Sequence, residues 1–243
     1  MGYSIINLLK SFKSFDLKSL EAANLLERKD FKYCFSINIL EEILNEMLAF
    51  YEVLQINEER CFTYETEYYD TENFDFFIDH HNGKGNRVKA RMRHYVQSEM
   101  TFVEQKNKNN KAVTTKFRDR IEDKNADLKE TWEEKLNLIL DKKCSVIYDR
   151  ITFLNIEKNE KITLDFNLQF KNENEIKSFK NICIAEIKCK ALQNSTFKYF
   201  MSKRHIHAFG LSKYCMAITQ LYPQIKHNNF KPILYKILKT NSI

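Results

Sequence analysis

Residues 86–96 read NRVKARMRHYV, and this stretch decides the fold. Every second residue from Arg87 to Arg93 is Lys or Arg, and the residues between them are apolar. A repeat of two is the repeat of a β-strand, because successive side chains point to opposite faces of the sheet. On a helix the same bases would be spread around the whole circumference. The stretch therefore predicts a strand with one cationic and one apolar face.

The same alternation recurs along the chain. Charged and apolar residues alternate around residues 28–33, 102–108, 114–121, 145–154, 161–166 and 182–190, and residues 61–70 form a further strand rich in Tyr, Thr and Phe. Strands that mostly follow one another, with helical spacing between and after them, favour a mainly antiparallel α+β domain. If helices cover the apolar faces, the polar faces meet one another. We therefore expect an α+β fold built on a closed antiparallel β-barrel tunnel of about eight strands, with flanking helices.

The composition indicates one globular domain. The 243 residues include 43% hydrophobic and 30% charged residues but only four Gly and two Pro, so no linker divides the chain. We expect residues 1–24 to form an N-terminal helical extension of the domain formed by residues 25–243. No stretch approaches the roughly 18 apolar residues of a membrane span. The six cysteines have no C-x-x-C spacing, which favours free thiols in the cytoplasm over disulfides or a zinc site.

The polar faces carry more bases than acids. The bases expected in the lumen are Arg28, Lys32, Arg87, Lys89, Arg91, Arg93, Lys106, Lys108, Lys116, Arg118, Arg120, Arg150, Lys161, Lys188 and Lys190. The carboxylates expected beside them are Asp30, Glu65, Glu67, Glu104, Asp165 and Glu186. Since burying an unpaired cation is costly, such a lumen is stable only if water and a polyanion fill it.

Phosphate is the anion that these side chains suit best. The guanidinium of Arg binds phosphate oxygens with two parallel donors, and the ammonium of Lys binds them as a point charge. The basic face of any single strand could instead be a surface in contact with solvent. Because several strands share the pattern, a common binding face is favoured over separate solvated surfaces. A nucleic-acid-binding sheet would place aromatic residues among the bases for stacking, and the basic strands have few. We therefore expect no nucleic-acid partner.

Successive short motifs of the chain resemble those of the VTC domain, in the same order. They are RKDFKY at 28–33, TEYYDT at 66–71, RVKARMRHY at 87–95, FVEQK at 102–106, YDR at 148–150, KITLD at 161–165, AEIK at 185–188 and SKY at 212–214. The VTC domain is the polyphosphate polymerase domain of the vacuolar transporter chaperone family, within the triphosphate tunnel metalloenzyme (CYTH-like) superfamily. Each motif is weak alone, and the ordered set is specific.

The resemblance implies a polyphosphate polymerase, a transferase that moves the γ-phosphoryl group of ATP to a growing inorganic polyphosphate chain, with Mn²⁺ or Mg²⁺ as cofactor. It implies that phosphates are bound by Lys32, Arg91, Arg93, Lys106, Arg118, Arg150, Lys161, Lys188, Ser212 and Lys213. Ser212 and Lys213 would close one end of the tunnel, and Glu186 would hold the metal. Tyr148 would pack near the nucleotide base or serve as a core aromatic. The reaction needs positioning and charge neutralisation rather than a covalent nucleophile.

The chain departs from the resemblance at two positions. Asp30 stands where the wider fold often has Glu, and Gly210 stands near the Ser-Lys pair where a base is expected.

Three other functions stay open from the sequence. The first keeps the fold and uses water as the acceptor, which gives a tripolyphosphatase or related triphosphate hydrolase. The second is a metal-dependent nuclease, because Asp165 followed by Glu186-x-Lys188 has the spacing of some nuclease metal ligands. That function leaves Arg91, Arg93 and the Ser212–Lys213 pair unexplained. The third is a non-catalytic polyanion-binding module.

Overall fold

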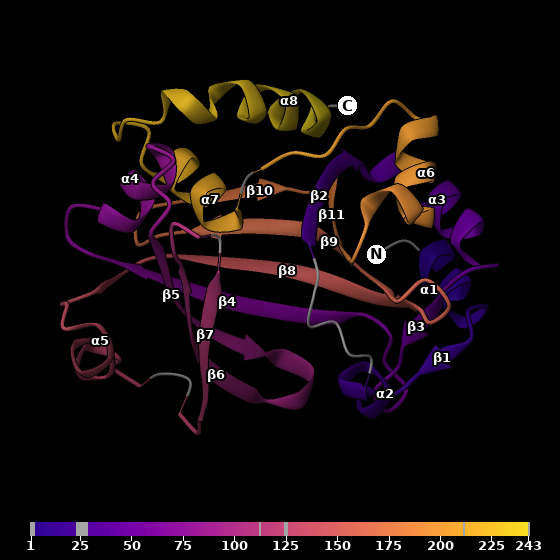
Figure 1. Ribbon diagram of the computed structural model, residues 1–243, viewed down its shortest axis with the longest axis horizontal. Coiled ribbons are helices and arrows are strands. Elements are labelled where there is room, and N and C mark those ends of the chain that lie inside the picture. The colour runs from indigo at the N-terminus through magenta and orange to yellow at the C-terminus, as the bar shows by residue number, and fades with distance from the viewer. Residues whose placement is uncertain (1–2, 23–28, 112, 124–125, 211, 243) are drawn as a thin grey trace.

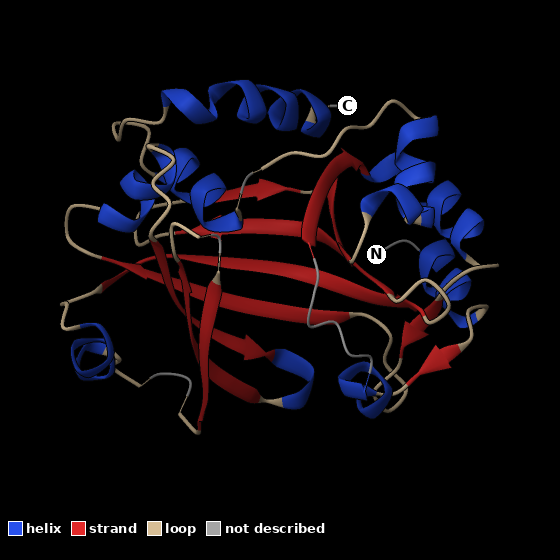
Figure 2. Ribbon diagram, viewed as in Figure 1, coloured by secondary structure: helices blue, strands red, loops and turns tan. Residues whose placement is uncertain are grey.

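One large antiparallel sheet organises the computed structural model, which describes residues 3–22, 29–111, 113–123, 126–210 and 212–242 (Figures 1 and 2). Arg28 and the expected boundary at residue 24 lie outside the described residues. Along the path of the sheet the strands are β2 (Lys29–Ser36), β11 (Ile182–Cys189), β9 (Glu160–Lys171), β8 (Asp141–Asn155), β4 (Phe62–Asp70), β5 (Arg87–Tyr95), β6 (Met100–Lys108) and β7 (Thr114–Ile121).

Three short strands extend this path at its sides. β1 (Ser14–Phe15) pairs with β3 (Glu52–Leu54), β3 pairs with β8, and β10 (Ile176–Phe179) pairs with β9. The strand expected around residues 86–96 is β5, so the alternation of bases and apolar residues predicted it correctly.

Closure of the sheet into a barrel is not confirmed. Among the described residues β2 and β7 are the two ends of the path and are not hydrogen-bonded to each other. The free edge of β2 is instead occupied by the segment after the sixth helix, where Phe209 N donates to Lys32 O at 2.8 Å. On the other side β7 carries a row of bases, which discourages pairing with a further strand. The sheet is therefore a curved, open sheet.

Helices cover the outer face of the sheet in two places (Figure 2). α1 (Tyr3–Lys10), α3 (Leu40–Met47) and α6 (Thr196–Lys203) lie together, and a hydrophobic cluster joins Leu44 of α3 and Phe197 of α6 to Phe153 and Ile162 of the sheet. α5 (Lys129–Leu136) covers β5 and β6, where Trp132 is fully buried against Met92. These two clusters bury the apolar sides of the alternating strands.

The concave face is covered at one end only. α7 (Lys213–Leu221) packs on it through Cys215 and Ile218, and α8 (Lys231–Asn241) lies over α7 as an outer layer (Figure 1). α4 (Asp75–His81) contacts α7 and β5, and α2 (Leu17–Ala22) follows β1. Short 3-10 helices span Ile37–Ile39, Val96–Ser98, Leu192–Asn194 and Asn228–Phe230. The rest of the concave face is left to polar side chains.

No helix in the described part of the chain combines the length and the apolar character needed to cross a membrane. α1 lies within residues 1–24, and it packs on α3.

Candidate phosphate-binding site

The concave face carries most of the bases expected in the lumen. Directly paired residues of neighbouring strands share a face. The register therefore places on one face Lys32, Arg87, Lys89, Arg91, Arg93, Lys106, Lys108, Lys116, Arg118, Arg120, Arg150, Lys161 and Lys188. Asp30, Glu104, Asp165 and Glu186 are carboxylates on this face, and Asp70 lies on it beneath α7. We call these side chains the basic face.

Two expected lumen carboxylates lie elsewhere. Glu65 pairs with Ile147, and Glu67 pairs with Met92, which belongs to the outer cluster beneath α5. Their placement in the lumen was wrong, because residues 62–70 alternate polar and aromatic side chains on both faces. Lys190 lies beyond the end of β11 and is exposed. The basic face is thus poorer in carboxylates than the sequence indicated.

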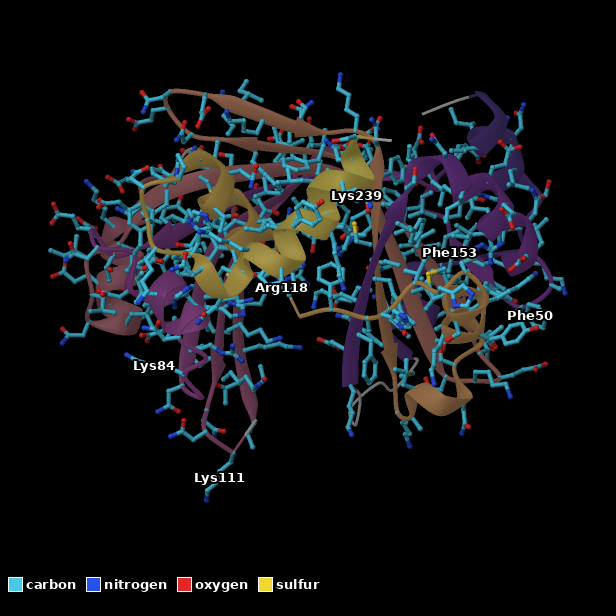
Figure 3. The ribbon with its side chains drawn as sticks, turned by 90° about the horizontal axis from the view of Figure 1, so that it is seen from above. Phe50, Lys84, Lys111, Arg118, Phe153 and Lys239 are labelled. Carbon is cyan, nitrogen blue, oxygen red and sulfur yellow. The ribbon has the colours of Figure 1, made fainter. Side chains whose placement is uncertain are left out.

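Opposite ends of the sheet face each other across the concave space. Burial lowers the pKa of Lys106 of β6. The charges of Asp30 and Lys32 of β2 also act on this pKa, so β2 lies near Lys106. Figure 3 shows Arg118 and other side chains projecting into the space between the two sides of the curved sheet. The curvature therefore brings bases of β2 and of β6 near one another on the concave side although the sheet is open.

Three guanidinium groups surround one carboxylate on β6. Arg91 Nε donates to Glu104 Oε2 at 2.6 Å, and the nearest nitrogens of Arg93 and Arg118 lie 3.5 and 3.6 Å from Glu104. Burial opposes ionisation of Glu104, but the charges of Arg91 and Arg93 outweigh it and lower its pKa to about 2. Arg118 also lies over the Phe102 ring at 3.8 Å. Glu104 thus orients three cations and neutralises the charge of one.

A second centre joins the sheet to α7. Arg150 grips the fully buried Asp165 with two donors, Nε at 2.5 Å and Nη2 at 2.7 Å, and Lys213 Nζ donates to the same carboxylate. Burial opposes ionisation of Asp165, but the charges of Arg150 and Lys213 lower its pKa. Both carboxylate oxygens are therefore occupied by cations. This weighs against Asp165 as the metal ligand that a nuclease would require.

Tyr148 lies between these cations rather than at an open surface. Its ring stacks on Tyr64 with centroids 5.3 Å apart, and Arg150 and Lys213 lie over it at 5.2 and 4.6 Å. The side chain is 2% exposed. Burial favours the neutral phenol, but the charges of Arg150 and Arg93 outweigh it and lower the pKa of Tyr148. The ring orients the cations and presents almost no surface to a nucleotide base.

Glu186 occupies the β2–β11 side of the basic face. It pairs with Lys32 in the register, and Lys188 Nζ lies 3.4 Å from its Oε1. Burial disfavours ionisation of Glu186, but the charges of Lys32 and Lys188 outweigh it and lower its pKa. Asp30 pairs with Lys188 and so lies diagonally from Glu186 on the same face. Lys161 lies beside Lys188 on β9.

This donor set fits a cation shared with phosphate rather than a cage made by protein alone. Within the described ranges no group of three or more His, Cys, Asp or Glu side chains could hold a metal ion. Mg²⁺ is commonly held by one or two carboxylates together with substrate phosphates. Glu186, with Asp30 diagonally opposite, supplies such a pair, whereas Glu104 and Asp165 are engaged by guanidinium groups.

The N-terminus of α7 is held in place from two sides. Ser212 Oγ caps the helix by accepting from Cys215 N at 3.1 Å, and Lys213 reaches Asp165. Tyr214 OH donates to the fully buried Asp70, which also accepts from Phe76 N and Phe77 N of α4 at 2.9 and 3.0 Å. Sequence reasoning missed Asp70 and Tyr214, although both lie within the quoted motifs. The chain therefore fixes Ser212 and Lys213 at one end of the basic face.

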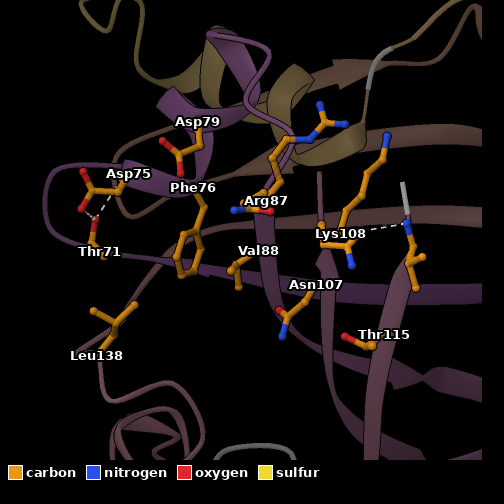
Figure 4. Close-up of a pocket in the computed structure, with 13 residues that line it drawn as sticks. Thr71, Asp75, Phe76, Asp79, Arg87, Val88, Asn107, Lys108, Thr115 and Leu138 are labelled. Carbon is orange, nitrogen blue, oxygen red and sulfur yellow. Dashed lines mark hydrogen bonds between the residues drawn. The ribbon is translucent and has the colours of Figure 1, made fainter. Parts of the chain in front are cut away.

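A pocket of about 460 Å³ lies apart from the centre of this face, between α4 and the ends of β5, β6 and β7 (Figure 4). Phe76, Val88 and Leu138 supply its apolar lining. Its carboxylates already have partners, since Asp79 pairs with Lys84 at 2.6 Å and Asp75 accepts from Thr71 Oγ1 at 2.7 Å. Arg87 and Lys108 of the basic face also line the pocket, so it adjoins one end of that face.

Comparisons with known proteins concern the fold and the family of the chain. The chain resembles a putative adenylyl cyclase from Hippeastrum, described as having a dominant triphosphatase activity, with a TM-score of 0.50, 10% identity and coverage of 80% of this chain and 96% of that one. It also resembles the PH1819 protein of Pyrococcus horikoshii, with a TM-score of 0.48, 14% identity and coverage of 81% and 99%. At 10% identity the likeness to the Hippeastrum protein supports the fold alone.

A putative adenylate cyclase from Vibrio parahaemolyticus is a further structural neighbour, with a TM-score of 0.45, 12% identity and coverage of 76% of this chain and 95% of that one. No curated protein matches the sequence. The family model described as the VTC domain matches residues 27–222, which is most of the chain and includes every strand of the basic face. The resemblance stated from the short motifs is thereby confirmed: the chain belongs to the VTC domain family.

Proposed function

We propose that the protein is a polyphosphate polymerase that transfers the γ-phosphoryl group of ATP to the end of an inorganic polyphosphate chain lying along the basic face. One observation supports this most. Rows of bases from both ends of the sheet converge on one concave space, and the carboxylates among them are few. A linear chain of phosphates is opposite in charge to such a surface and extended like it.

The side chains of this face would bind and orient the substrates. The guanidinium groups held by Glu104, from Arg91, Arg93 and Arg118, would grip phosphate oxygens on the β5–β7 side. Arg150 and Lys213, fixed by Asp165, would grip them at the α7 end. Because these donors are already oriented, little reorganisation is needed when charge shifts between the oxygens of the transferred group.

The remaining lysines and one carboxylate would complete the substrate site. Lys32, Lys106, Lys161 and Lys188 would neutralise the growing chain, and Ser212 would limit its path at the α7 end. Glu186, aided by Asp30, would hold Mn²⁺ or Mg²⁺. When bound, the ion would supply positive charge to the non-bridging oxygens. A terminal phosphate oxygen is itself the attacking group, so we assign no general base.

A triphosphate hydrolase of the same fold is the second candidate. The Hippeastrum neighbour is described as having triphosphatase activity, and the open sheet gives water a route to the same phosphates. In this reaction water would take the place of the polyphosphate end. We expect either reaction to run in the cytoplasm, where the six free cysteines would stay reduced.

The test is incubation of the purified protein with ATP and Mn²⁺ or Mg²⁺, with separate measurement of polyphosphate and of free phosphate. We expect polyphosphate, and we expect Arg91→Ala and Glu186→Ala to abolish it. Lys142→Ala is the matched control, because Lys142 pairs with Glu67 on the outer face. Free phosphate without polymer would favour the hydrolase. Polymer formation retained by both site variants would contradict the assignment of the site.

A further inference from the structure

The charges of the chain divide unevenly at Glu186. No Asp or Glu follows this residue, whereas ten Lys and Arg do, so the first 186 residues carry four more acids than bases. Two of the ten, Lys188 and Lys213, belong to the candidate site. Lys203 and Arg204 are neutralised by carboxylates of α3. The others leave a concentration of positive charge that phosphate binding on the basic face does not explain.

Much of this charge lies on the exposed side of α8. The helix is amphipathic, and Leu234 and Ile237 on its inner side are 6% and 2% exposed. Its outer side presents Lys231, Tyr235, Lys236, Leu238 and Lys239. In the described part of the chain no ion pair engages these three lysines. The outer side of α8 therefore carries three lysines, and the helix contains no Asp or Glu.

The same side of α8 also exposes apolar surface. Tyr235 is 70% exposed and Leu238 is 41% exposed. At a spacing of three residues the two lie next to each other on a helix, and Lys231 and Lys239 each lie four residues from Tyr235. An exposed aromatic and an exposed aliphatic side chain flanked by lysines are the pattern of a helix that lies in a membrane interface. In a monomer surrounded by water, these exposed apolar side chains contribute no burial of apolar surface.

Other bases extend the surface at both ends of the helix. Lys226 is exposed shortly before α8. At the opposite end Asn181 Nδ2 donates to Asn241 O at 2.7 Å, which brings the exposed Lys180 beside the last turn. α8 is the outermost layer on its side of the molecule, as Figures 1 and 3 show. A flat surface can therefore approach its whole length.

We propose that the outer side of α8 docks the protein on the surface of a bilayer rich in anionic phospholipid. The lysines would contact headgroup phosphates, while Tyr235 and Leu238 would enter the boundary between headgroups and acyl chains. A soluble polyanion would use the lysines but leave the apolar pair without a role. A second copy packed through α8 would bring like charges together. An anionic bilayer uses both features.

Vesicle co-sedimentation of the full chain tests the proposal, with phosphatidylcholine vesicles compared with vesicles that also contain phosphatidylglycerol. We expect salt-sensitive binding to the second kind only. Since each lysine near an anionic surface contributes about a factor of five, combined Lys231→Glu, Lys236→Glu and Lys239→Glu should weaken binding at least about a hundredfold. Combined Tyr235→Ser and Leu238→Ser should weaken it about tenfold or more.

A charge-matched control uses three exposed lysines elsewhere, through combined Lys111→Glu, Lys129→Glu and Lys158→Glu, and should bind as the unchanged protein does. Equal binding to both kinds of vesicle, or equal loss in the control, would overturn the proposal. So would retention of binding after the Tyr235 and Leu238 substitutions, which would indicate a track for soluble polyanions. A dimer that dissociates in the α8 variants during sedimentation would identify a second copy as the partner instead.

Discussion

Lys213 at the first turn of α7 and Arg150 in the middle of β8 share one carboxylate, that of Asp165. The three residues come from parts of the chain that the sequence separates widely, and they meet where α7 covers the end of the concave face. Two cations that would otherwise repel each other are thereby fixed in one orientation. The end of the basic face at α7 depends on this contact.

Substitution Asp165→Asn should therefore reduce both stability and phosphate binding. Removing the charge leaves two buried cations without their partner, which costs about 3–5 kcal/mol in comparable buried pairs. Urea unfolding at neutral pH would measure the free energy of unfolding. Asp141→Asn is the control, because the Asp141 side chain is 44% exposed and lies 3.4 Å from Lys143. A loss below that of the control would show that the shared carboxylate does not hold α7.

Tyr214→Phe should loosen α7 through Asp70. The substitution removes the hydroxyl that donates to this buried carboxylate, while the donors from Phe76 N and Phe77 N remain. We expect a loss of about 1–3 kcal/mol in the free energy of unfolding, as for a buried polar group that loses one partner. Tyr235→Phe, at an exposed position on α8, should change stability little. Equal stability of the two variants would contradict the role assigned to Asp70.

Glu104 should make stability depend on pH in the acid range. Its pKa is about 2 in the folded protein against an ordinary value of 4.5. A depressed carboxyl pKa adds stability above the unfolded value, and this contribution is lost as pH falls from about 4.5 toward about 2. The shift corresponds to about 3 kcal/mol. Urea unfolding at several pH values should show a shallower decline for Glu104→Gln than for Glu122→Gln, which alters an exposed carboxyl. Identical declines would contradict the depressed pKa.

Lys89 should take up a proton when a polyanion binds. Burial and the charges of Lys32 and Lys106 lower its pKa to about 8. Phosphates nearby would raise that pKa, so the affinity for tripolyphosphate should fall as pH rises through about 8. Calorimetry in buffers of different ionisation enthalpy would count the protons. Lys89→Met should remove the uptake near pH 8, and uptake that persists in this variant would place the titrating group elsewhere.

The sequence was sufficient to predict which side chains of most strands share a face. The alternation in β5 is strict, because bases and apolar residues cannot exchange faces without burying charge. In β4 both faces carry polar and aromatic residues, so Glu65 and Glu67 were assigned to the wrong face. The periodic signal fails where the two faces have similar polarity.

Contacts between segments far apart in the chain could not be predicted from the sequence. Closure of the sheet depends on which segment pairs with the edge of β2. Phe209 lies at that edge because of the position of α6, which precedes it in the chain. Asp70 and Tyr214 are 144 residues apart, and no local pattern indicates that they meet. The position of Tyr148 between Arg150 and Lys213 likewise follows from packing between β8 and α7.

A crystal structure of the protein with tripolyphosphate and Mn²⁺ tests the central claim most directly. We predict a chain of phosphates along the concave face, between β5 and β6 on one side and β2 and β11 on the other. Its oxygens should lie within hydrogen-bonding distance of Arg91, Arg118 and Lys188. Phosphate bound on the outer face of the sheet, with these three side chains directed into bulk solvent, would contradict the account.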